Sequence, residues 1–184
     1  MTLHEKIDYI INNIGSIGGT KDYLDIWENG RSYGFSAYYN SNASGNKWTK
    51  FYYLPDHLHI ENYAKGYGRI VSNYMYYKPV DLTNIKKLEL EHWMSGTADY
   101  WALGVSKTSK IAAPLQTEAL LYNIEKSTGQ ISATNNTSAL QTTILDVSNL
   151  SGEYYIYIGI DSSSPSSVEN TLNFYVNHLY GLYK

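Results

Sequence analysis

The amino-acid sequence predicts an all-β antiparallel sandwich that follows one short N-terminal helix. Short runs of β-branched and aromatic residues recur from Asp22 onward, and turns rich in Gly, Asn and Ser separate them. A spacing of roughly 8–12 residues between such runs is typical of sandwiches and barrels. No segment of helix length lies between the runs, which disfavours a parallel α/β sheet.

The N-terminal helix is predicted from the spacing of its apolar residues. They are separated by four, three, four and three positions, which is an a/d heptad seam over about two heptads. Glycines at positions 15, 18 and 19 end the segment. Isoleucine at both seam positions favours three parallel strands, so residues 1–19 are expected either to trimerise or to pack on their own sandwich. The seam consists of Leu3, Ile7, Ile10, Ile14 and Ile17.

Residues 20–184 are expected to form one sandwich domain, because a chain of this length commonly builds a single core. Asn29-Gly30 between the first two strand segments predicts a hairpin. The principal strands are expected at Tyr23 to Trp27, Tyr33 to Tyr39, Lys47 to Tyr53, His57 to Glu61, Arg69 to Tyr77, Lys87 to Trp93, Tyr100 to Ser106, Gln141 to Asp146, Glu153 to Asp161 and Asn170 to Leu182.

Composition excludes several classes of function. The formal net charge is -3 and no basic run occurs, so nucleic-acid binding is not expected. The absence of Cys removes disulfides, thiolate zinc sites and cysteine nucleophiles. No apolar segment reaches the roughly 18 residues of a membrane-spanning helix, and the N-terminus lacks the apolar core of a signal peptide. Synthesis in the cytoplasm is therefore expected.

Catalytic motifs are missing from the sequence. It contains no G-x-S-x-G elbow, no H-E-x-x-H pair and no phosphate-binding loop. The carboxylates of Asp22, Asp25 and Glu28, or those of Glu89 and Glu91, could form a glycosidase pair only if the fold set them at a suitable distance. Outward charges on strands usually face solvent, so the protein is not expected to be an enzyme.

Aromatic residues dominate the candidate binding surface, and 20 of them are tyrosines. Alternation along three strands directs Trp93, Tyr155, Tyr157 and Tyr175 away from the core. If these strands share a sheet, its outer face carries four aromatic rings beside Glu and Asn side chains. Such a face suits a sugar ring, but it also suits a subunit interface, and Tyr is in addition a common strand former.

A second aromatic group lies around the polar loop of residues 40–46, and it is a comparable candidate for ligand binding. Trp48 is the residue of this group that we select as a ligand contact. The group contains Trp27, Tyr38, Tyr39, Trp48, Tyr52 and Tyr53.

Metal binding is a minor hypothesis. His57-Leu58-His59 places two imidazoles on one strand face, where they could share a transition metal, although ordinary surface or interface histidines are the more common case. A calcium ion held by loop carboxylates near Asp161 or Asp22 is a second option. No cofactor is otherwise expected.

Several segments resemble jelly-roll modules, of the galactose-binding-like kind, in tail and baseplate proteins of Gram-positive phages; these are in turn similar to carbohydrate-binding modules. The segments are KPVDLT at Lys78 to Thr83, LEL at Leu88 to Leu90, YWALGVS at Tyr100 to Ser106 and LDVSNLSGEYYI at Leu145 to Ile156. The resemblance spans Arg69 to Tyr183. It implies an eight-stranded jelly roll with ligand contacts on loops or one sheet face, and N-terminal trimerisation helices are common in tail fibres.

These observations lead to a main hypothesis and two alternatives. The main hypothesis is a non-catalytic phage-type tail or baseplate protein, a homotrimer that binds host-surface carbohydrate or joins other tail proteins. It would be found in the virion or outside the cell. The alternatives are a carbohydrate-binding module of a secreted glycan-active protein, and a purely structural sandwich.

Overall fold

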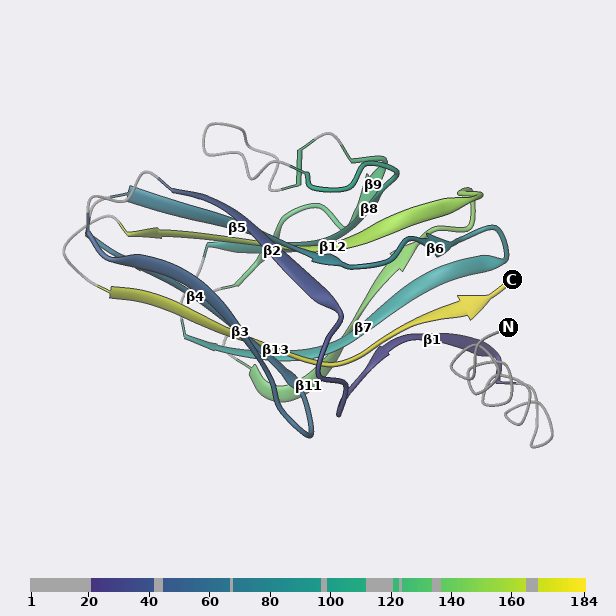
Figure 1. The fold of residues 1–184 in the computed structure, drawn as a ribbon, viewed down its shortest axis with the longest axis horizontal. Helices are drawn as coiled ribbons and strands as arrows, with labels where there is room; N and C mark the ends of the chain where they lie inside the picture. Colours follow the sequence, from purple (N-terminus) through teal and green to yellow (C-terminus); the bar gives the residue numbers. More distant parts are fainter. Residues whose placement is uncertain are drawn as a thin grey trace, which may run out of the picture.

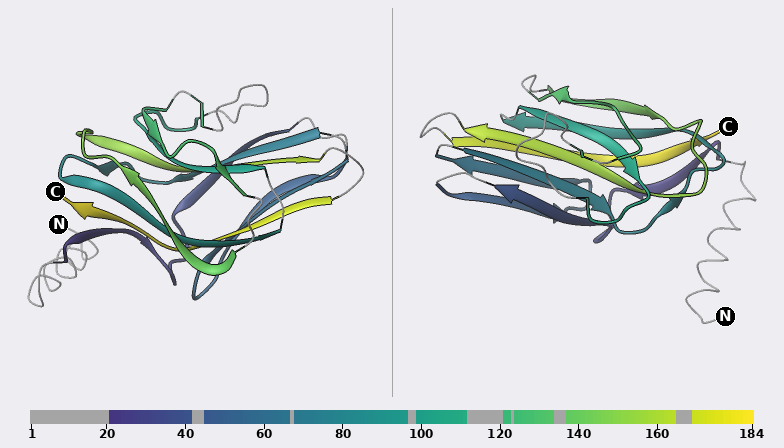
Figure 2. Two further views of the ribbon diagram at one scale, coloured as in Figure 1. Left: turned by 180° about the vertical axis from the view of Figure 1, so that it is seen from behind. Right: turned by 90° about the horizontal axis from the view of Figure 1, so that it is seen from above.

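A computed structural model describes residues 21–41, 45–66, 68–96, 99–111, 121–122, 124–133, 137–164 and 169–184. These residues form thirteen strands, arranged in two facing antiparallel sheets (Figure 1). The same two layers are seen from behind and from above in Figure 2. The predicted all-β sandwich is confirmed, whereas the predicted helix of residues 1–19 lies outside the described residues.

Sheet A has the strand order β11-β7-β13-β4-β3. The long strand β13 pairs with β7 along one edge, and its other edge is shared by β4 and then β1. Every neighbouring pair is antiparallel. The strands are β1 (Tyr23–Glu28), β3 (Lys47–Tyr53), β4 (Leu58–Lys65), β7 (Ile85–Gly96), β11 (Thr137–Asp146) and β13 (Glu169–Tyr183).

Sheet B has the strand order β10-β8-β12-β5-β2, with β6 paired to β12 and β9 paired to β8. From β4 to β13 the long strands alternate between the two sheets, so strands that follow one another in the sequence are not neighbours. The strands are β2 (Phe35–Ser41), β5 (Gly68–Tyr76), β6 (Val80–Asp81), β8 (Tyr100–Ser106), β9 (Lys126–Ser127), β10 (Ile131–Ser132) and β12 (Glu153–Ser164).

The hydrophobic core lies between the sheets and follows the alternation of the sequence. Leu88 and Leu90 of β7 are buried, and so are Leu172, Phe174 and Val176 of β13. From β12, the inward-facing isoleucines at positions 156, 158 and 160 complete the opposite wall. Because side chains alternate sides with a period of two, the inward and outward residues of these strands were predictable from the sequence alone.

The predicted hairpin at Asn29-Gly30 is wrong. A turn does form there, and Gly30 has a φ of +79°, but β1 belongs to sheet A and β2 to sheet B. The buried indole of Trp27 occupies the space where the chain passes between the sheets, and its Nε1 donates to the Tyr33 carbonyl at 3.0 Å. A short-range turn signal does not reveal which strand each arm pairs with afterwards.

Two similar turns connect the sheets at one end of the sandwich. The backbone N–H of Thr83 donates to Asp81 Oδ1, and that of Ser148 donates to Asp146 Oδ1, both at 2.9 Å. These hydrogen bonds lower the pKa of each aspartate. The side-chain-to-backbone turns expected from the sequence are therefore present. The described residues include no helix long and apolar enough to cross a membrane.

Candidate functional site

The outward side of sheet A carries a row of aromatic side chains, which we call the aromatic row. It takes one residue from each of four neighbouring strands: Tyr52 of β3, His59 of β4, Tyr175 of β13 and Trp93 of β7. Each residue lies directly opposite the next in the strand register. The row therefore runs across the strands rather than along any one of them. We call this side of sheet A the open face.

Ring contacts hold the row together. The rings of Tyr175 and Trp93 are stacked, with centroids 5.0 Å apart and planes 8° apart. His59 stacks on Tyr175 at 4.7 Å, and Tyr52 lies 5.5 Å from His59. The ring of His57 contacts both Trp93 and Tyr175 edge-on, at 5.1 and 5.3 Å. Because each ring supports its neighbour, the row is preorganised and presents its outward edges together with the more exposed Tyr52.

Trp48 joins the same face through a second stack. Its ring lies 3.7 Å from that of Tyr63, with planes 8° apart, and its Nε1 donates to Glu61 Oε1 at 2.8 Å. The Lys50 ammonium lies 4.9 Å from the Trp48 ring centroid. Trp48 and Tyr52 are four residues apart on β3, so they point to the same side of the sheet. The structure thus brings Trp48, Trp93 and Tyr175 onto one face.

Polar side chains border the aromatic row. Asn173 Oδ1 lies 2.8 Å from His59 Nε2, which places an amide beside the ring stack. On the far side of β13, Asn177 Nδ2 donates to Glu91 Oε2 and Tyr180 donates its hydroxyl hydrogen to Glu89 Oε2, both at 2.7 Å. Each of these donors occupies one carboxylate oxygen. Amides and carboxylates at the margin of an aromatic surface can accept hydrogen bonds from ligand hydroxyl groups.

Tyr155 and Tyr157 lie on the opposite side of the molecule. Both belong to β12 of sheet B, while Trp93 and Tyr175 belong to sheet A, so the condition for grouping the four rings on one face is not met. Tyr157 is 0% exposed and donates its hydroxyl hydrogen to the Thr108 carbonyl at 2.6 Å. Burial raises the pKa of Tyr157 to about 12. Alternation predicts the side of a strand, but not the sheet to which the strand belongs.

The outer side of sheet B, which we call the covered face, is shielded by the chain that follows β8. Ile111 and Leu121 pack there against Tyr157. Gly104 makes this approach feasible, since a Cβ at that position would lie 2.6 Å from Leu121 Cδ1 and 2.9 Å from Ile124 Cδ1. The two outer faces of the sandwich are therefore different environments for the same residue type.

The histidine pair proposed as a metal site is engaged in the aromatic face. His57 Nδ1 lies 2.8 Å from Asp56 Oδ1, and His59 is bound to Asn173. Metal binding by this pair stays a prediction. Arg69 hydrogen-bonds both carboxylate oxygens of Asp161, through Nε at 2.7 Å on one side, which leaves that carboxylate closed to calcium. Asp22 is exposed at the start of β1.

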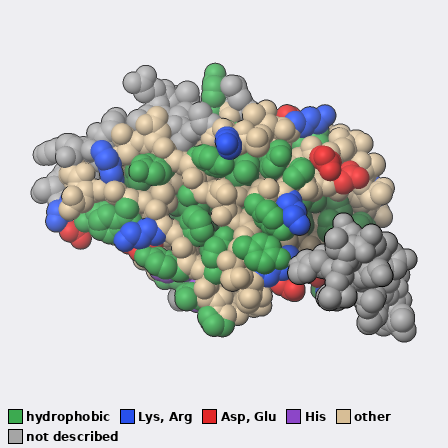
Figure 3. Space-filling view, viewed as in Figure 1, with side chains coloured by type: hydrophobic (Ala, Val, Ile, Leu, Met, Phe, Trp, Pro, Cys, Tyr) green, Lys and Arg blue, Asp and Glu red, His purple; other side chains and the backbone are tan. Residues whose placement is uncertain are grey.

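The edge of the sandwich shows a mixed surface. Figure 3 has the viewpoint of Figure 1 and looks onto the edge where β2 and β3 lie, with hydrophobic side chains spread among polar ones. Histidine is visible at the lower margin, toward the open face. Exposed aromatic residues at this edge include Tyr39, which is 59% exposed, and Tyr52, which is 41% exposed. The aromatic surface thus continues from the open face onto the edge at β3.

Comparisons with known proteins bear on the fold. No protein-family model matches the chain, and no curated protein matches its sequence. A solved structure described as a study of promiscuous specificity in carbohydrate-binding modules of the β-sandwich superfamily has a TM-score of 0.51 and 12% identity, over 88% of this chain and 62% of that one. At that identity the match shows the fold alone: the chain is structurally similar to β-sandwich carbohydrate-binding modules.

Two other solved structures show weaker similarity. The family 11 carbohydrate-binding module of the cellulosomal cellulase Lic26A-Cel5E of Clostridium thermocellum has a TM-score of 0.48 and 13% identity, covering 90% of this chain and 95% of that one. The glycoside hydrolase domain structure of Endo-D from Streptococcus pneumoniae R6 has a TM-score of 0.47 and 13% identity, covering 79% of this chain. The chain spans only 21% of the Endo-D structure.

Proposed function

We propose that this protein is a non-catalytic jelly-roll carbohydrate-binding module that holds a glycan on the open face of sheet A. The observation that carries the proposal is the aromatic row, in which Tyr52, His59, Tyr175 and Trp93 come from four adjacent strands and lie in register. A part-exposed, preorganised aromatic surface with hydrogen-bonding groups at its margin is the usual chemistry of a site for an amphipathic ligand.

A sugar ring matches this surface because it has apolar C–H groups and polar hydroxyls. The apolar groups would pack against the row, and the hydroxyls would reach the amide and carboxylate groups beside it. Successive ring centroids are 4.7–5.5 Å apart, so the row is long enough to contact several units of an extended glycan lying across the strands. Glu61, Glu89 and Glu91 lie at its margin, which favours neutral over anionic polysaccharides.

The carboxyl groups of the described residues support a binding role rather than a catalytic one. Hydrolysis of a glycoside needs a general acid, which is a carboxyl group whose pKa is raised. Wherever a carboxyl pKa is clearly shifted in the described part of the chain, it is lowered by hydrogen bonds from neighbouring side chains or backbone. This applies to Asp25, Asp81, Asp146 and Glu169.

Binding to a panel of soluble neutral and anionic polysaccharides tests the proposal, measured by affinity electrophoresis and calorimetry. Trp93→Ala and Tyr175→Ala are expected to abolish or strongly weaken binding. Tyr100→Ala is the matched control, since Tyr100 is 42% exposed but belongs to β8 of sheet B. A wild-type protein that binds no polysaccharide, or a Trp93→Ala variant with unchanged affinity, would refute the proposal.

Membership of a phage-type tail or baseplate, trimeric assembly and a place in the virion or outside the cell stay predictions from the sequence. They depend on the apolar seam from Leu3 to Ile17, which lies outside the described residues. Light scattering during gel filtration tests the assembly. A mass of three times 20.9 kDa that falls when Ile10 and Ile14 become polar would support it, and a monomer would refute it.

A further inference from the structure

An irregularity in β1 places two carboxylates on the same side of the strand. The pairing of β1 with β13 shifts register between Asp25 and Trp27, and Ile26 and Trp27 are both buried. In a regular strand, residues three apart point to opposite faces. The bulge therefore directs both Asp25 and Glu28 away from the core, as β-bulges commonly re-aim side chains.

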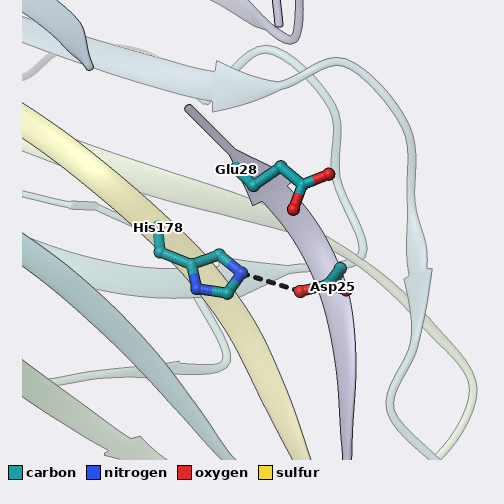
Figure 4. A group of neighbouring side chains, drawn as sticks. All are labelled: Asp25, Glu28 and His178. Carbon is teal, nitrogen blue, oxygen red and sulfur yellow. Dashed lines mark hydrogen bonds and ion pairs between the residues drawn. The ribbon is translucent and has the colours of Figure 1, made fainter. Parts of the chain in front are cut away.

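A second irregularity brings an imidazole to the same place. The pairing of β13 with β7 shifts register between Val176 and His178, and His178 lies directly opposite Glu28. Its Nε2 is 2.8 Å from Asp25 Oδ1 (Figure 4). Ligand atoms of Asp25, Glu28 and His178 all lie within 4.8 Å of one another. Two bulges on paired strands thus converge on one group of side chains.

The chemistry of this group favours a transition metal over calcium or magnesium. One imidazole nitrogen and two carboxylates are a ligand set that suits zinc, whereas calcium and magnesium prefer oxygen alone. Ligand atoms around tetrahedral zinc are about 3.3 Å apart, given its bond lengths. The Glu28 side chain is 50% exposed, so it can move inward to complete such a geometry.

Competing interactions at the group are weak. Lys21 Nζ lies 2.6 Å from Asp25 Oδ2, and Arg31 Nη2 lies 3.5 Å from Glu28 Oε1. The Lys21 side chain is 57% exposed, and exposed ion pairs of this kind are readily displaced. Partial burial opposes ionisation of Asp25, but hydrogen bonds from Lys21 and His178 outweigh it and lower its pKa. Asp25 is therefore anionic at neutral pH, as a metal ligand must be.

We propose that Asp25, Glu28 and His178 bind a zinc-class metal ion that links β1 to β13. Three protein ligands leave one coordination position for water. The Nε2 atom of His178 must be unprotonated to coordinate, so the ion replaces its hydrogen bond to Asp25. The bound ion would resist separation of β1 from the edge of sheet A. This proposal is independent of glycan binding, because it uses none of the residues of the aromatic row.

Calorimetric titration of the metal-free full-length protein with ZnCl₂ and CaCl₂ tests the proposal. We expect one zinc per chain, no calcium binding at equal concentrations, and a higher unfolding midpoint with zinc. His178→Gln is expected to weaken zinc binding by about 100-fold or more, because loss of an outer-shell group already costs about 10- to 100-fold. Glu28→Gln should also weaken binding, and its exposure makes it unlikely to disturb folding.

The matched control is the double variant His57→Gln/His59→Gln, which removes the other neighbouring pair of imidazoles and should keep zinc affinity. Circular dichroism of each metal-free variant verifies its fold. Three results would overturn the proposal: a wild-type protein without zinc binding, unchanged affinity in both the His178 and Glu28 variants, or loss of zinc binding in the His57/His59 variant alone.

Discussion

The outer faces of the two sheets carry the same kind of residue in different environments. On the covered face, Tyr157 is 0% exposed beneath the chain that follows β8. On the open face, Tyr175 and Trp93 remain part-exposed and stack on each other. The comparison teaches that an outward aromatic side chain supports the fold where the protein covers it, and is available to a ligand where the protein does not.

Side-chain size explains much of this difference. Ala102 and Gly104 of β8 leave room above sheet B, so Leu121 and Ile124 can pack closely on it. The corresponding surface of sheet A is filled by large rings that pack against one another across four strands. A covering segment would have to displace those rings.

Removal of the Tyr157 ring is expected to have the largest effect. Tyr157→Ala should lower the free energy of unfolding by about 3 to 5 kcal/mol, because it leaves a cavity under the covered face. Denaturant unfolding measures the loss. Tyr157→Phe keeps the ring and should lose about 1 kcal/mol, the contribution of one hydrogen bond to the Thr108 carbonyl. A loss below about 1 kcal/mol for the alanine variant would mean that the covered face contributes little to stability.

A pH effect separates the two sides of β7, where His92 points inward and Trp93 outward. His92 is 1% exposed, and burial lowers its pKa from 6.5 to about 4. The unfolded chain therefore binds the proton first, so stability is full above pH 6.5 and falls as the pH drops toward 4. The loss should reach about 3 kcal/mol. Denaturant unfolding at several pH values measures it.

The control for the pH effect is His92→Gln, which should flatten the stability profile between these two pH values. If the wild-type and His92→Gln profiles run parallel, burial of His92 is not the cause. The acidic groups of the open face titrate in both proteins, so their contribution cancels in this comparison.

A double-mutant cycle on Trp93 and Tyr175 is expected to give a smaller effect. Their coupling in the free energy of unfolding should be about 1 kcal/mol, the usual value for a stacked aromatic pair. The single variants should each cost less stability than Tyr157→Ala. Equal losses on both faces would remove the distinction between a covered face and an open one.

The smallest expected effect is at the edge of the open face. Lys50→Gln removes the ammonium group 4.9 Å from the Trp48 ring and should change the free energy of unfolding by about 0.5 kcal/mol. Trp fluorescence should report the change around Trp48. Lys47→Gln is the control, since Lys47 is exposed on the same strand. Identical fluorescence in both variants would argue against the cation–π contact.

The sequence predicted part of the candidate site. Trp48, Trp93 and Tyr175 were expected to point outward, and they do lie on one face. Tyr52 belonged to the second aromatic group, and His59 was considered only as a metal ligand, because nothing local indicates that it stacks on Tyr175. The register that joins these strands connects distant segments, as in the contact between His59 and Asn173, which are 114 residues apart.

Alternation and turn chemistry in the sequence by themselves determined the strand positions, the inward and outward side of each strand, and the aspartate turns near residues 81 and 146. These features depend on a period of two or on side-chain-to-backbone bonds two residues away, so they are local. Only the tertiary structure decided which strands share a sheet, which aromatic rings form the row, and which face is covered. These depend on strand pairings and on packing by a later segment of the chain, which no local pattern encodes.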